Sequence, residues 1–484
     1  MSTPLSLRTR VAPRSSVATR RSDPVSPPTR ATTPGATPAA VFEGQVGGAA
    51  VLVAGSPAQL DAPARAAWMK QSLLQDHSAL AARNPEGLKA KLEKLTTSPF
   101  VFFRGTAGLL YRELQGLDDD KPRLLINGDV HPENFGIVKG RDGELFFAPN
   151  DFDEATVAPF SWDLRRGAVG FLLAARELGL SRKERERLVE RFVDAYAEAL
   201  EDFGKGDAEA GFRITAKRAP TVLKRLFDDA EKLSRKAFLG RHVDVGGGVF
   251  RDGDELARDP GLVPALTRAL SAARGRDGAR LSASLRAAGL SPLKVKDVAR
   301  KLGSGTASVG LDRFWLLVEG PRGDGSDDRV LELKSELCSI VDRVRPRSLA
   351  ATRLAESAGA RVARAHEVHL AEGDPLYGHT RFGGQSFLVR ERIPEKARVE
   401  LSSLKDDELI DYAAVCARAL AAAHARADED GGLEGRDVET RIRASFKKGA
   451  FAEELFSWAS AAADRVEADH GSLVRMLEDG SFDA

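Results

Sequence analysis

The stretch between residues 123 and 154 constrains the fold of this chain most. Residues 123–126 (RLLI) have the composition of a short buried strand, and a polar loop follows them. Two more short apolar runs come next, at 135–138 (FGIV) and 145–148 (LFFA), and the residues between them include two glycines and an aspartate. Such a turn favours a β-hairpin. The sequence therefore predicts a strand, a polar loop and a hairpin in immediate succession.

Polar side chains stand at both ends of this hairpin. Asp129 and Asn134 lie in the loop before it, and Asp151 follows its second strand. A loop carboxylate can take the proton of an attacking hydroxyl, and carboxylate and amide oxygens are the ligands that Mg²⁺ prefers. We therefore expect Asp129 to act as the base and Asn134 with Asp151 to hold magnesium. The plainer interpretation is a polar turn whose acids cap helices.

Four neighbouring side chains have two interpretations each. Asp153 and Glu154 either support the metal ligands or begin the next helix. His131 is either a metal ligand or a hydrogen-bonding prop for its loop. Arg104, within residues 103–106 (FRGT), either grips a phosphate with its forked guanidinium or pairs with one of the acids.

A glycine-rich run occurs much later in the chain, at residues 303–310 (GSGTASVG). Gly303, Gly305 and Gly310 precede a strand predicted over 311–319. Glycines allow backbone N–H groups to approach phosphates closely, so this run is a candidate nucleotide-binding loop. Many runs of this kind are ordinary turns.

A second predicted strand, residues 329–334, ends at Lys334. A lysine at this place can offset phosphate charge, or it can be a solvated charge at a strand end. Glu356, in a helix predicted over residues 347–365, is one candidate partner for Lys334, and Glu336 is its rival.

Residues 128–134 and 150–153 resemble the catalytic and metal-binding motifs of aminoglycoside and choline phosphotransferases, which belong to the protein-kinase-like superfamily. A longer stretch, covering most of residues 65–475, is similar to the bacterial domain-of-unknown-function family 2252, and most clearly at 98–166. The matching segments are Ser98-Pro99-Phe100, Phe103-Arg104-Gly105, Gly128-Asp129, His131, Asn134-Phe135-Gly136, Asn150 to Glu154, Pro159-Phe160, Trp162-Asp163-Leu164, Arg166, Gly305 to Gly310 and Ala423 to Arg426. The resemblance implies ATP and Mg²⁺ as cofactors, and it implies that Asp163 braces the catalytic loop.

The order of the motifs departs from that of kinases, which place the glycine loop and the lysine before the catalytic loop. We therefore expect an α+β, protein-kinase-like two-lobed fold that is circularly permuted. Its large, mostly helical lobe would combine residues 60–300 with C-terminal helices at 400–480. The small β-rich nucleotide-binding lobe would be residues 303–395, with a strand at 387–392 as the hinge.

Helical segments are predicted from periodicity and capping residues. Residues 61–97 are rich in Ala, Leu, Lys and Glu, with a break at Asn84. Ser181 and Glu184 have the spacing of a capping box, ahead of apolar residues at helical spacing. A further helix is predicted over residues 404–424, with a cap at Ser403 or Asp406.

Composition excludes several classes of protein. With 42% apolar and 30% charged residues and a net charge of +1, the 484-residue chain has no global attraction to nucleic acid or to anionic membranes. No apolar run is long enough to span a bilayer. Residues 1–45 have the composition of a disordered basic tail, and no apolar segment follows to make a secretory signal. The two cysteines, Cys338 and Cys416, are predicted to be buried thiols, which favours a cytoplasmic protein.

These observations predict an ATP- and Mg²⁺-dependent phosphotransferase acting on a small-molecule hydroxyl, with the nucleotide and an unknown acceptor as its partners. Nucleotidyl transfer is a related possibility within the same fold. A catalytically silent kinase-like binding module and a metal-dependent hydrolase are the two alternatives from other classes.

Overall fold

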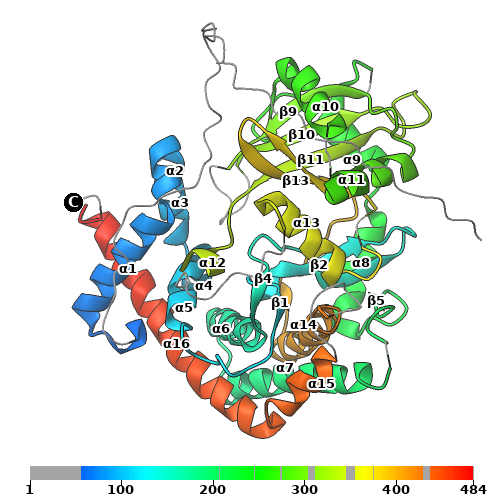
Figure 1. Cartoon of the computed structure of the whole chain (residues 1–484). Helices are drawn as coiled ribbons and strands as arrows, with labels where there is room; N and C mark the ends of the chain where they lie inside the picture. The colour runs from blue at the N-terminus through cyan, green and yellow to red at the C-terminus, as the bar shows by residue number, and fades with distance from the viewer. Residues whose placement is uncertain are drawn as a thin grey trace, which may run out of the picture. The chain divides into compact units, whose positions relative to one another are not determined.

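The computed structural model describes residues 56–482, apart from residues 207, 245, 273–274, 304–310, 345–354, 374 and 429–436 and the side chains of 275–280. The tail predicted over residues 1–45 lies outside the described residues, as do Gly305 and Gly310. The described chain is a mixed α+β structure, which confirms the predicted class (Figure 1).

Five helices open the described chain, after a 3-10 turn at Pro57–Gln59. They are α1 (Ala62–Asp76), α2 (Ser78–Arg83), α3 (Pro85–Leu95), α4 (Pro99–Gly105) and α5 (Ala107–Glu113). The predicted break is confirmed, because α2 ends at Arg83 and the Asn84 side chain caps α3 by accepting a hydrogen bond from Gly87 N–H (2.8 Å).

The predicted strand, loop and hairpin are also confirmed. Strand β1 (Arg123–Ile126) leads into the loop, which ends in a 3-10 turn at Pro132–Asn134. Strands β2 (Phe135–Lys139) and β3 (Leu145–Pro149) then pair antiparallel, and Gly143 takes the left-handed conformation in their turn (φ +84°). Strand β4 (Thr156–Pro159) returns to pair with β1, so both ends of the loop and hairpin are fixed close together.

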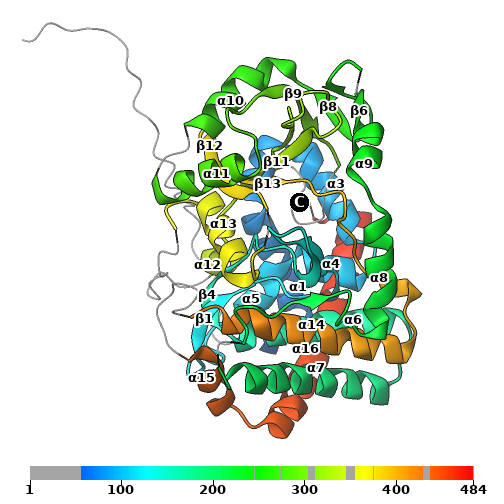
Figure 2. The ribbon, with the colours of Figure 1, turned by 90° about the vertical axis from the view of Figure 1, so that its right-hand side faces the viewer.

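Four long helices and the short α15 form a group beneath this loop and hairpin. They are α6 (Ser161–Glu177), α7 (Arg182–Phe203), α14 (Asp406–Ala425), α15 (Val438–Ala444) and α16 (Lys448–Glu478). Helices α7 and α14 lie side by side (Figure 2). The capping box of Ser181 and Glu184 is present. The N-cap position of α14 is occupied by Lys405, whose backbone N–H donates to Glu408 Oε2 (2.9 Å), and not by the predicted Ser403 or Asp406. Cys416 is buried in α14 as predicted, but Cys338 is exposed.

A six-stranded antiparallel sheet forms the rest of the β structure, in the order β12-β13-β11-β10-β9-β8. Its strands are β8 (Leu256–Arg258), β9 (Val295–Lys301), β10 (Arg313–Val318), β11 (Arg329–Glu336), β12 (Tyr377–Phe382) and β13 (Gln385–Glu391). The strands predicted over 311–319, 329–334 and 387–392 are thus confirmed. Strands β8 and β9 lie in a stretch where the sequence predicted none.

Helices cover the two faces of this sheet. Helices α10 (Val263–Ser271) and α11 (Gly275–Ala287) contribute Leu266 and Leu281 to one apolar cluster, together with Phe387 and Val389 of β13. Helix α13 (Ala358–His369) packs on the opposite face, where Leu388 joins the main core. This alternation follows from the two-residue period of a strand.

Short elements complete the described chain. They are β5 (Ile214–Thr215), α8 (Thr221–Lys232), α9 (Arg235–His242), β6 (Val243–Asp244), β7 (Val249–Phe250), α12 (Ile340–Val344) and 3-10 turns at Pro260–Leu262 and Leu401–Ser403. Strand β5 extends the β2–β3 hairpin and β6 pairs with β7. In the described residues, no helix combines the length and the apolar character needed to cross a membrane.

Candidate functional site

The loop between β1 and β2 is held to the helices by one buried carboxylate. Asp163, in the first turn of α6, accepts hydrogen bonds from the backbone N–H groups of Asn127 (2.7 Å) and Gly128 (2.9 Å). His424 Nε2 lies 3.0 Å from the same carboxylate, and the Tyr196 hydroxyl lies 2.7 Å from His424 Nδ1. Helices α6, α7 and α14 therefore fix the start of the loop, and Asp163 braces it as the resemblance implied.

Gly128 brings this loop against the segment that follows the hairpin. Its φ of +79° is a left-handed conformation that residues with a Cβ disfavour. A Cβ at this position would also collide with the backbone carbonyl of Glu154. The Gly128 carbonyl accepts a hydrogen bond from the buried Tyr111 hydroxyl (2.6 Å). The close approach of the two polar segments thus depends on a glycine here.

Asp129 is held by Arg166 and Asn134. Arg166 donates from Nε to Asp129 Oδ1 (2.7 Å) and pairs with the same oxygen through a second nitrogen. The Asn134 amide donates to the Asp129 carbonyl (2.9 Å) and to its Oδ2 (3.2 Å). Burial raises the pKa of Asp129 above its ordinary value, although Arg166 opposes the shift. Asn134 Nδ2 is a donor in this arrangement, so Asn134 Oδ1 is left as the acceptor atom.

His131 behaves as a prop for the loop. Its Nδ1 accepts a hydrogen bond from Glu133 N–H (3.2 Å), and its ring is buried edge-on against Phe100. Burial, together with the nearby Arg104, lowers the pKa of His131 well below its usual value, so the ring is neutral. Of the two interpretations of His131, these contacts match the hydrogen-bonding prop.

Arg104, on α4, forms an ion pair. Its Nη1 lies 2.6 Å from Glu133 Oε2, and its guanidinium stacks over the Phe100 ring at 5.6 Å. Arg398 lies 3.4 Å from the same Glu133 oxygen. Of the two interpretations of Arg104, these contacts match the ion pair with an acid. Arg104 also lines the cavity beside Asp129, described below.

The segment after the hairpin presents its polar and apolar side chains in different directions. Phe152 is buried, with its ring 4.7 Å from that of His366 and 5.2 Å from that of His369, both on α13. The Asp151 side chain, one residue earlier, is 44% exposed. Phe152 therefore anchors the segment to α13 while Asp151 stays accessible to a ligand.

Two further anchors fix this segment. Arg361 of α13 donates to the backbone carbonyls of Asp153 (2.7 Å) and Ala155 (2.6 Å). The Glu154 carboxylate accepts a hydrogen bond from Ile340 N–H at the start of α12. Glu154 thus has a structural partner, and the backbone of this segment is held from the side of the sheet.

Lys334 reaches this segment from β11. Its ammonium forms an ion pair with Asp153, and its Nζ lies 3.7 Å from Asp151 Oδ1 and 3.9 Å from Glu336 Oε1. Lys334 is 4% exposed, so it is not a solvated strand-end charge. Burial opposes its charge, but the three acids more than compensate and raise the pKa of Lys334.

The two aspartates beside Lys334 titrate differently. Partial burial tends to raise the pKa of Asp151, but Lys334 and a hydrogen bond with Asp153 outweigh this effect, so the pKa of Asp151 falls below its ordinary range. Burial and the Asp151 charge raise the pKa of Asp153. Asp151 is therefore ionised at neutral pH.

The remaining predicted residues lie elsewhere. Glu356 is exposed in the turn before α13, outside the helix in which it was predicted, and Arg381 donates to its backbone carbonyl (3.3 Å). Glu336, its rival, is the glutamate near Lys334. Gly303 follows β9 with a φ of +61°. Leu311, just after the predicted glycine loop, lines the same cavity as Asp129.

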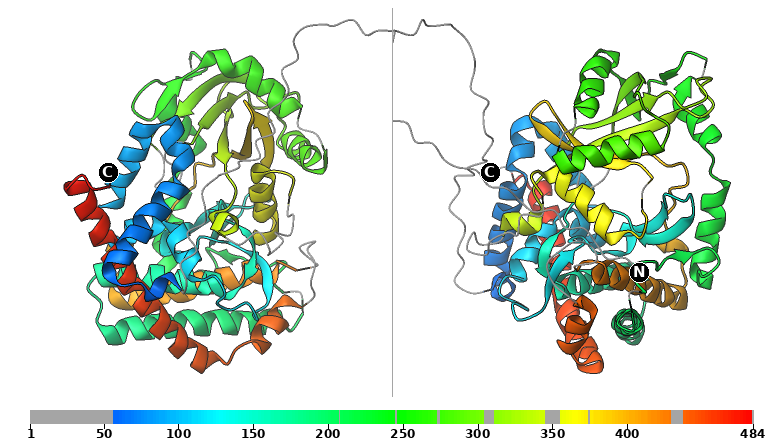
Figure 3. Two further views of the ribbon diagram at one scale, coloured as in Figure 1. Left: turned by 60° about the vertical axis from the view of Figure 1, so that its left-hand side comes forward. Right: turned by 45° about the vertical axis from the view of Figure 1, so that its right-hand side comes forward.

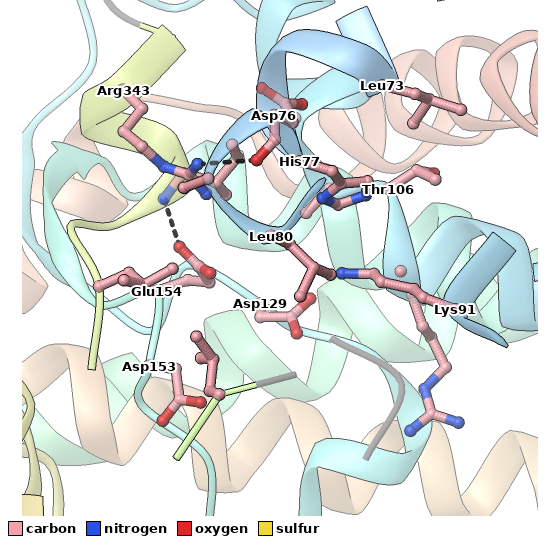
Figure 4. Close-up of a pocket in the computed structure, with 18 of the residues that line it drawn as sticks. Leu73, Asp76, His77, Leu80, Lys91, Thr106, Asp129, Asp153, Glu154 and Arg343 are labelled. Carbon is pink, nitrogen blue, oxygen red and sulfur yellow. Dashed lines mark hydrogen bonds between the residues drawn. The ribbon is translucent and has the colours of Figure 1, made fainter. Parts of the chain in front are cut away.

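A cavity adjoins Asp129 (Figure 4). Asp129, Asp153 and Glu154 line one side of it, and His77 and Lys91 of the N-terminal helices line the other. Across the described ranges, no group of three or more His, Cys, Asp or Glu side chains is arranged to hold a metal.

The family model described as "Uncharacterized protein conserved in bacteria (DUF2252)" matches residues 83–476. The match extends over most of the chain, from α2 to α16. The chain belongs to the DUF2252 family. No curated protein and no solved structure matches it. Asp129, Asp151 and Lys334 lie within the DUF2252 region, as do their partners Arg166, Asn134, Asp153 and Glu336, whereas His77 of the cavity lies before it.

Sequence reasoning missed three contacts of this DUF2252 site. Arg166 was noted only as part of a matching segment, yet it pairs with Asp129. Two adjacent arginines in an otherwise apolar helix were the available signal, because a buried arginine needs an acidic partner. Nothing local signalled Arg361 or the pairing of Lys334 with Asp153, since both depend on the placement of β11 and α13.

Proposed function

We propose that this DUF2252 protein is an ATP- and Mg²⁺-dependent phosphotransferase that acts on a small-molecule hydroxyl. One observation carries the proposal. The buried Lys334 of the six-stranded sheet meets Asp151 and Asp153, which precede it by about 180 residues, next to the loop that carries Asp129. A base, an ionised carboxylate and a lysine in one place are the protein groups that phosphoryl transfer requires.

The roles follow from the environment of each group. Asp129 accepts the proton of the acceptor hydroxyl as the acceptor oxygen bonds to the γ-phosphorus. The bond between that phosphorus and the bridging oxygen breaks, and ADP leaves. Lys334 offsets phosphate charge from its place on β11. Arg166 orients Asp129 through Oδ1. Oδ2 accepts one hydrogen bond, from Asn134, and its remaining lone pair is the one we assign to the acceptor hydroxyl.

The donor atoms near the loop suit magnesium. Asn134 offers its amide oxygen, because its amide nitrogen is occupied by Asp129. Asp151 offers an ionised, accessible carboxylate. Both are hard oxygen ligands of the kind that Mg²⁺ takes alongside nucleotide phosphates. When bound, the ion would neutralise phosphate charge.

The connectivity of the sheet supports a kinase-like fold with permuted lobes. Strands β9, β10 and β11 are successive neighbours, and the predicted glycine loop falls between the first two. The lysine lies on the third, a helix (α13) follows, and β12 and β13 complete the sheet. Protein kinases carry their lysine on the third strand, and the helix after it supplies a glutamate. Here Asp153 and Glu336 face Lys334 in place of a helix glutamate.

Thermal unfolding with Mg-ATP, ATP alone and Mg²⁺ alone tests ligand binding. The fold should be stabilised most by Mg-ATP, by about 2.7 kcal/mol at a ligand concentration of 100 times Kd. An Asp151→Ala variant should lose the contribution of magnesium. If Mg-ATP causes no shift, the phosphotransferase proposal fails.

Turnover tests the role of Asp129. Asp129→Asn should lower the rate of ADP formation by roughly 10²- to 10⁴-fold, because a general base contributes this much, and should leave Mg-ATP affinity nearly unchanged. The exposed Asp120→Asn is the matched control. Release of pyrophosphate would indicate nucleotidyl transfer, and turnover without nucleotide would indicate a hydrolase. Equal rates for Asp129→Asn and wild type would remove Asp129 as the base.

A further inference from the structure

The cavity beside Asp129 is built mainly from the N-terminal helices (Figure 4). Helices α1 to α5 supply most of its lining, and α12 supplies Ile340 and Arg343. Asp129, the proposed base, lines the cavity as well. The cavity therefore lies where an acceptor must lie if Asp129 takes the proton of its hydroxyl.

The acids of this lining have partners of their own. They are side chains that ion-pair or accept hydrogen bonds, and each is held by a group that does not depend on a ligand. The pairs are Asp76 with Arg112 (2.9 and 2.7 Å), Asp129 with Arg166, Asp153 with Lys334, and Glu154 with the backbone N–H of Ile340. No acid of the lining therefore needs a cationic ligand.

The four cationic side chains of the lining are also matched by acids or by solvent. Arg104 lies 2.6 Å from Glu133, and Arg83 is exposed. Burial lowers the pKa of Lys91 to about 8, while the charges of Glu154 and Asp76 oppose this shift. Arg343 donates to the Asp76 carbonyl (3.2 Å) and acts on the Glu154 charge. With four cationic and four acidic side chains, the formal charges of the lining cancel.

A charged ligand would have to compete with these existing partners. A charge that loses its partner inside a protein costs several kcal/mol, whereas a hydroxyl needs only a hydrogen bond. The lining therefore favours an uncharged molecule over an anion or a cation of the same size.

Uncharged hydrogen-bonding groups stand among the charged ones. Burial lowers the pKa of His77 to about 3, so its ring is neutral, and its Nε2 makes no hydrogen bond within the described part of the chain. The Thr106 hydroxyl donates to the Phe102 carbonyl (2.8 Å), which leaves its oxygen as an acceptor. Hydroxyl groups of a bound molecule can satisfy both atoms.

The size and the apolar part of the lining limit the molecule further. The cavity has a volume of about 120 Å³, and Leu73, Leu80 and Leu337 line it together with the polar groups. Since a cavity of about 150 Å³ can hold benzene, this one suits a molecule or moiety of about six non-hydrogen atoms. Its leucines can pack against the carbon chain of such a molecule.

We propose that this cavity binds the acceptor, and that the acceptor is a small uncharged polyol. One hydroxyl faces Asp129, a second bonds to His77 or Thr106, and the carbon chain lies against the leucines. The role of the polyol as acceptor rests on the proposed phosphotransferase function. Its binding depends only on the lining of the cavity.

Binding of a matched series of compounds to the whole protein tests this inference. Glycerol, glycerate and aminopropanediol share a carbon chain and are uncharged, anionic and cationic. In calorimetric titrations with saturating Mg-ADP, glycerol should bind saturably and at least about tenfold more tightly than either charged compound. Saturation separates site binding from the general stabilisation of proteins by polyols. Equal or tighter binding of a charged compound, or no saturable binding of glycerol, would overturn the proposal.

Variants of the uncharged polar groups locate the binding site. Thr106→Val keeps the shape of the side chain and should weaken glycerol binding by roughly 2- to 10-fold through the loss of one hydrogen bond. His77→Phe should have a similar effect, and it provides a second test if Thr106→Val does not fold. Thr97→Val is the matched control, because Thr97 is exposed and its hydroxyl also donates to a helix carbonyl (2.7 Å). Wild-type affinity in both cavity variants would place the polyol elsewhere and refute the inference.

Mg-ADP binding, measured without a polyol, distinguishes the two proposals. If Mg-ADP binds and glycerol does not, the polyol acceptor is refuted and the phosphotransferase proposal stands. If glycerol binds through Thr106 or His77 and Mg-ADP does not bind, the cavity is a polyol site and the phosphotransferase proposal fails.

Discussion

Single residues in the loop and in the segment after the hairpin decide how closely the two approach. Gly128 has a left-handed backbone conformation and lies against the Glu154 carbonyl. A side chain at this position would therefore cause both backbone strain and a steric clash. The Asp163 carboxylate and the Tyr111 hydroxyl fix the same residue from below. The positions of Asp129 and Asp151 relative to each other therefore depend on Gly128.

Gly128→Ala should destabilise the protein by more than the roughly 1–2 kcal/mol that a left-handed conformation costs, because the loop must also move away from Glu154. Gly143→Ala is a matched control: it has a similar φ of +84°, but a Cβ there meets no atom within 4 Å. Chemical denaturation measures both variants. Equal losses would show that the contact between Gly128 and Glu154 is unimportant.

The lowered pKa of Lys91 predicts how the stability of the protein depends on pH. Its pKa is about 8 in the folded protein and 10.5 in a model peptide, so between these values the unfolded chain binds more protons. Stability contributed by this group therefore rises as pH increases from about 8 to 10.5. The charged groups around Lys91 that enter this shift are Arg343, Glu154 and Asp76.

The comparison of wild type with Lys91→Met isolates this effect, because other titrating groups cancel in the difference. The free energy of unfolding of the wild type, relative to the variant, should increase between pH 7.5 and pH 10. A difference that does not vary with pH would show that Lys91 is solvated.

At the scale of elements, α13 connects the six-stranded sheet to the segment that carries Asp151. Arg361 donates to the carbonyls of Asp153, Ala155 and Leu337, with donor–acceptor distances of 2.6 to 2.8 Å. Phe152 packs against His366 and His369 of the same helix. A displacement of α13 would therefore move Asp151 and Asp153 relative to Lys334.

Arg361→Met should lower stability by roughly 3–5 kcal/mol, because it leaves buried carbonyls without donors, and should weaken Mg-ATP binding through the displaced acids. Arg381→Met is the control, since Arg381 is exposed on β12 and donates to a single carbonyl. Denaturation and nucleotide titration measure the two effects. Full nucleotide affinity in Arg361→Met would show that α13 does not position these acids.

Local patterns were enough to predict the elements around Asp129. Strand β1, the β2–β3 hairpin and the capped helix α7 each follow from apolar periodicity, turn residues or a capping box within a few residues. Strands β8 and β9 were missed because β9 (VKDVARK) mixes charged and apolar residues, and its stability comes from pairing with β10. Pairing between distant segments overrides local propensity.

The candidate residues of the site were easier to name from the sequence than the contacts between them. Asp129, Asn134, Asp151 and Lys334 could be named as candidates because each falls in a recognisable motif. Glu356 was placed in a helix by its surroundings, but the helix begins after it, at Ala358. Contacts such as that of Lys334 with Asp153 depend on three-dimensional packing, which no spacing in one sequence records.

At the scale of the whole molecule, ion pairs join parts of the described chain that are distant in sequence. Arg65 of α1 binds Asp469 of α16 through two contacts of 2.8 and 2.6 Å, although 404 residues separate them. Figure 3 shows α1 and α16 side by side. In another part of the molecule, the six-stranded sheet reaches the segment after the hairpin through the ion pair of Lys334 with Asp153. The helices that line the cavity and the strand that carries Lys334 thus converge on the Asp129 loop.

The affinity of Mg-ATP for wild type and Lys334→Met, measured by titration calorimetry, tests the central claim most directly. Lys294→Met, a change to an exposed lysine near the same sheet, is the control. A lysine hydrogen-bonded to phosphate contributes about 1.5–3 kcal/mol, so Lys334→Met should bind Mg-ATP roughly 10- to 100-fold more weakly, and Lys294→Met should bind as the wild type does. Equal affinity in Lys334→Met and wild type would contradict a nucleotide site assembled from this sheet and the Asp129 loop.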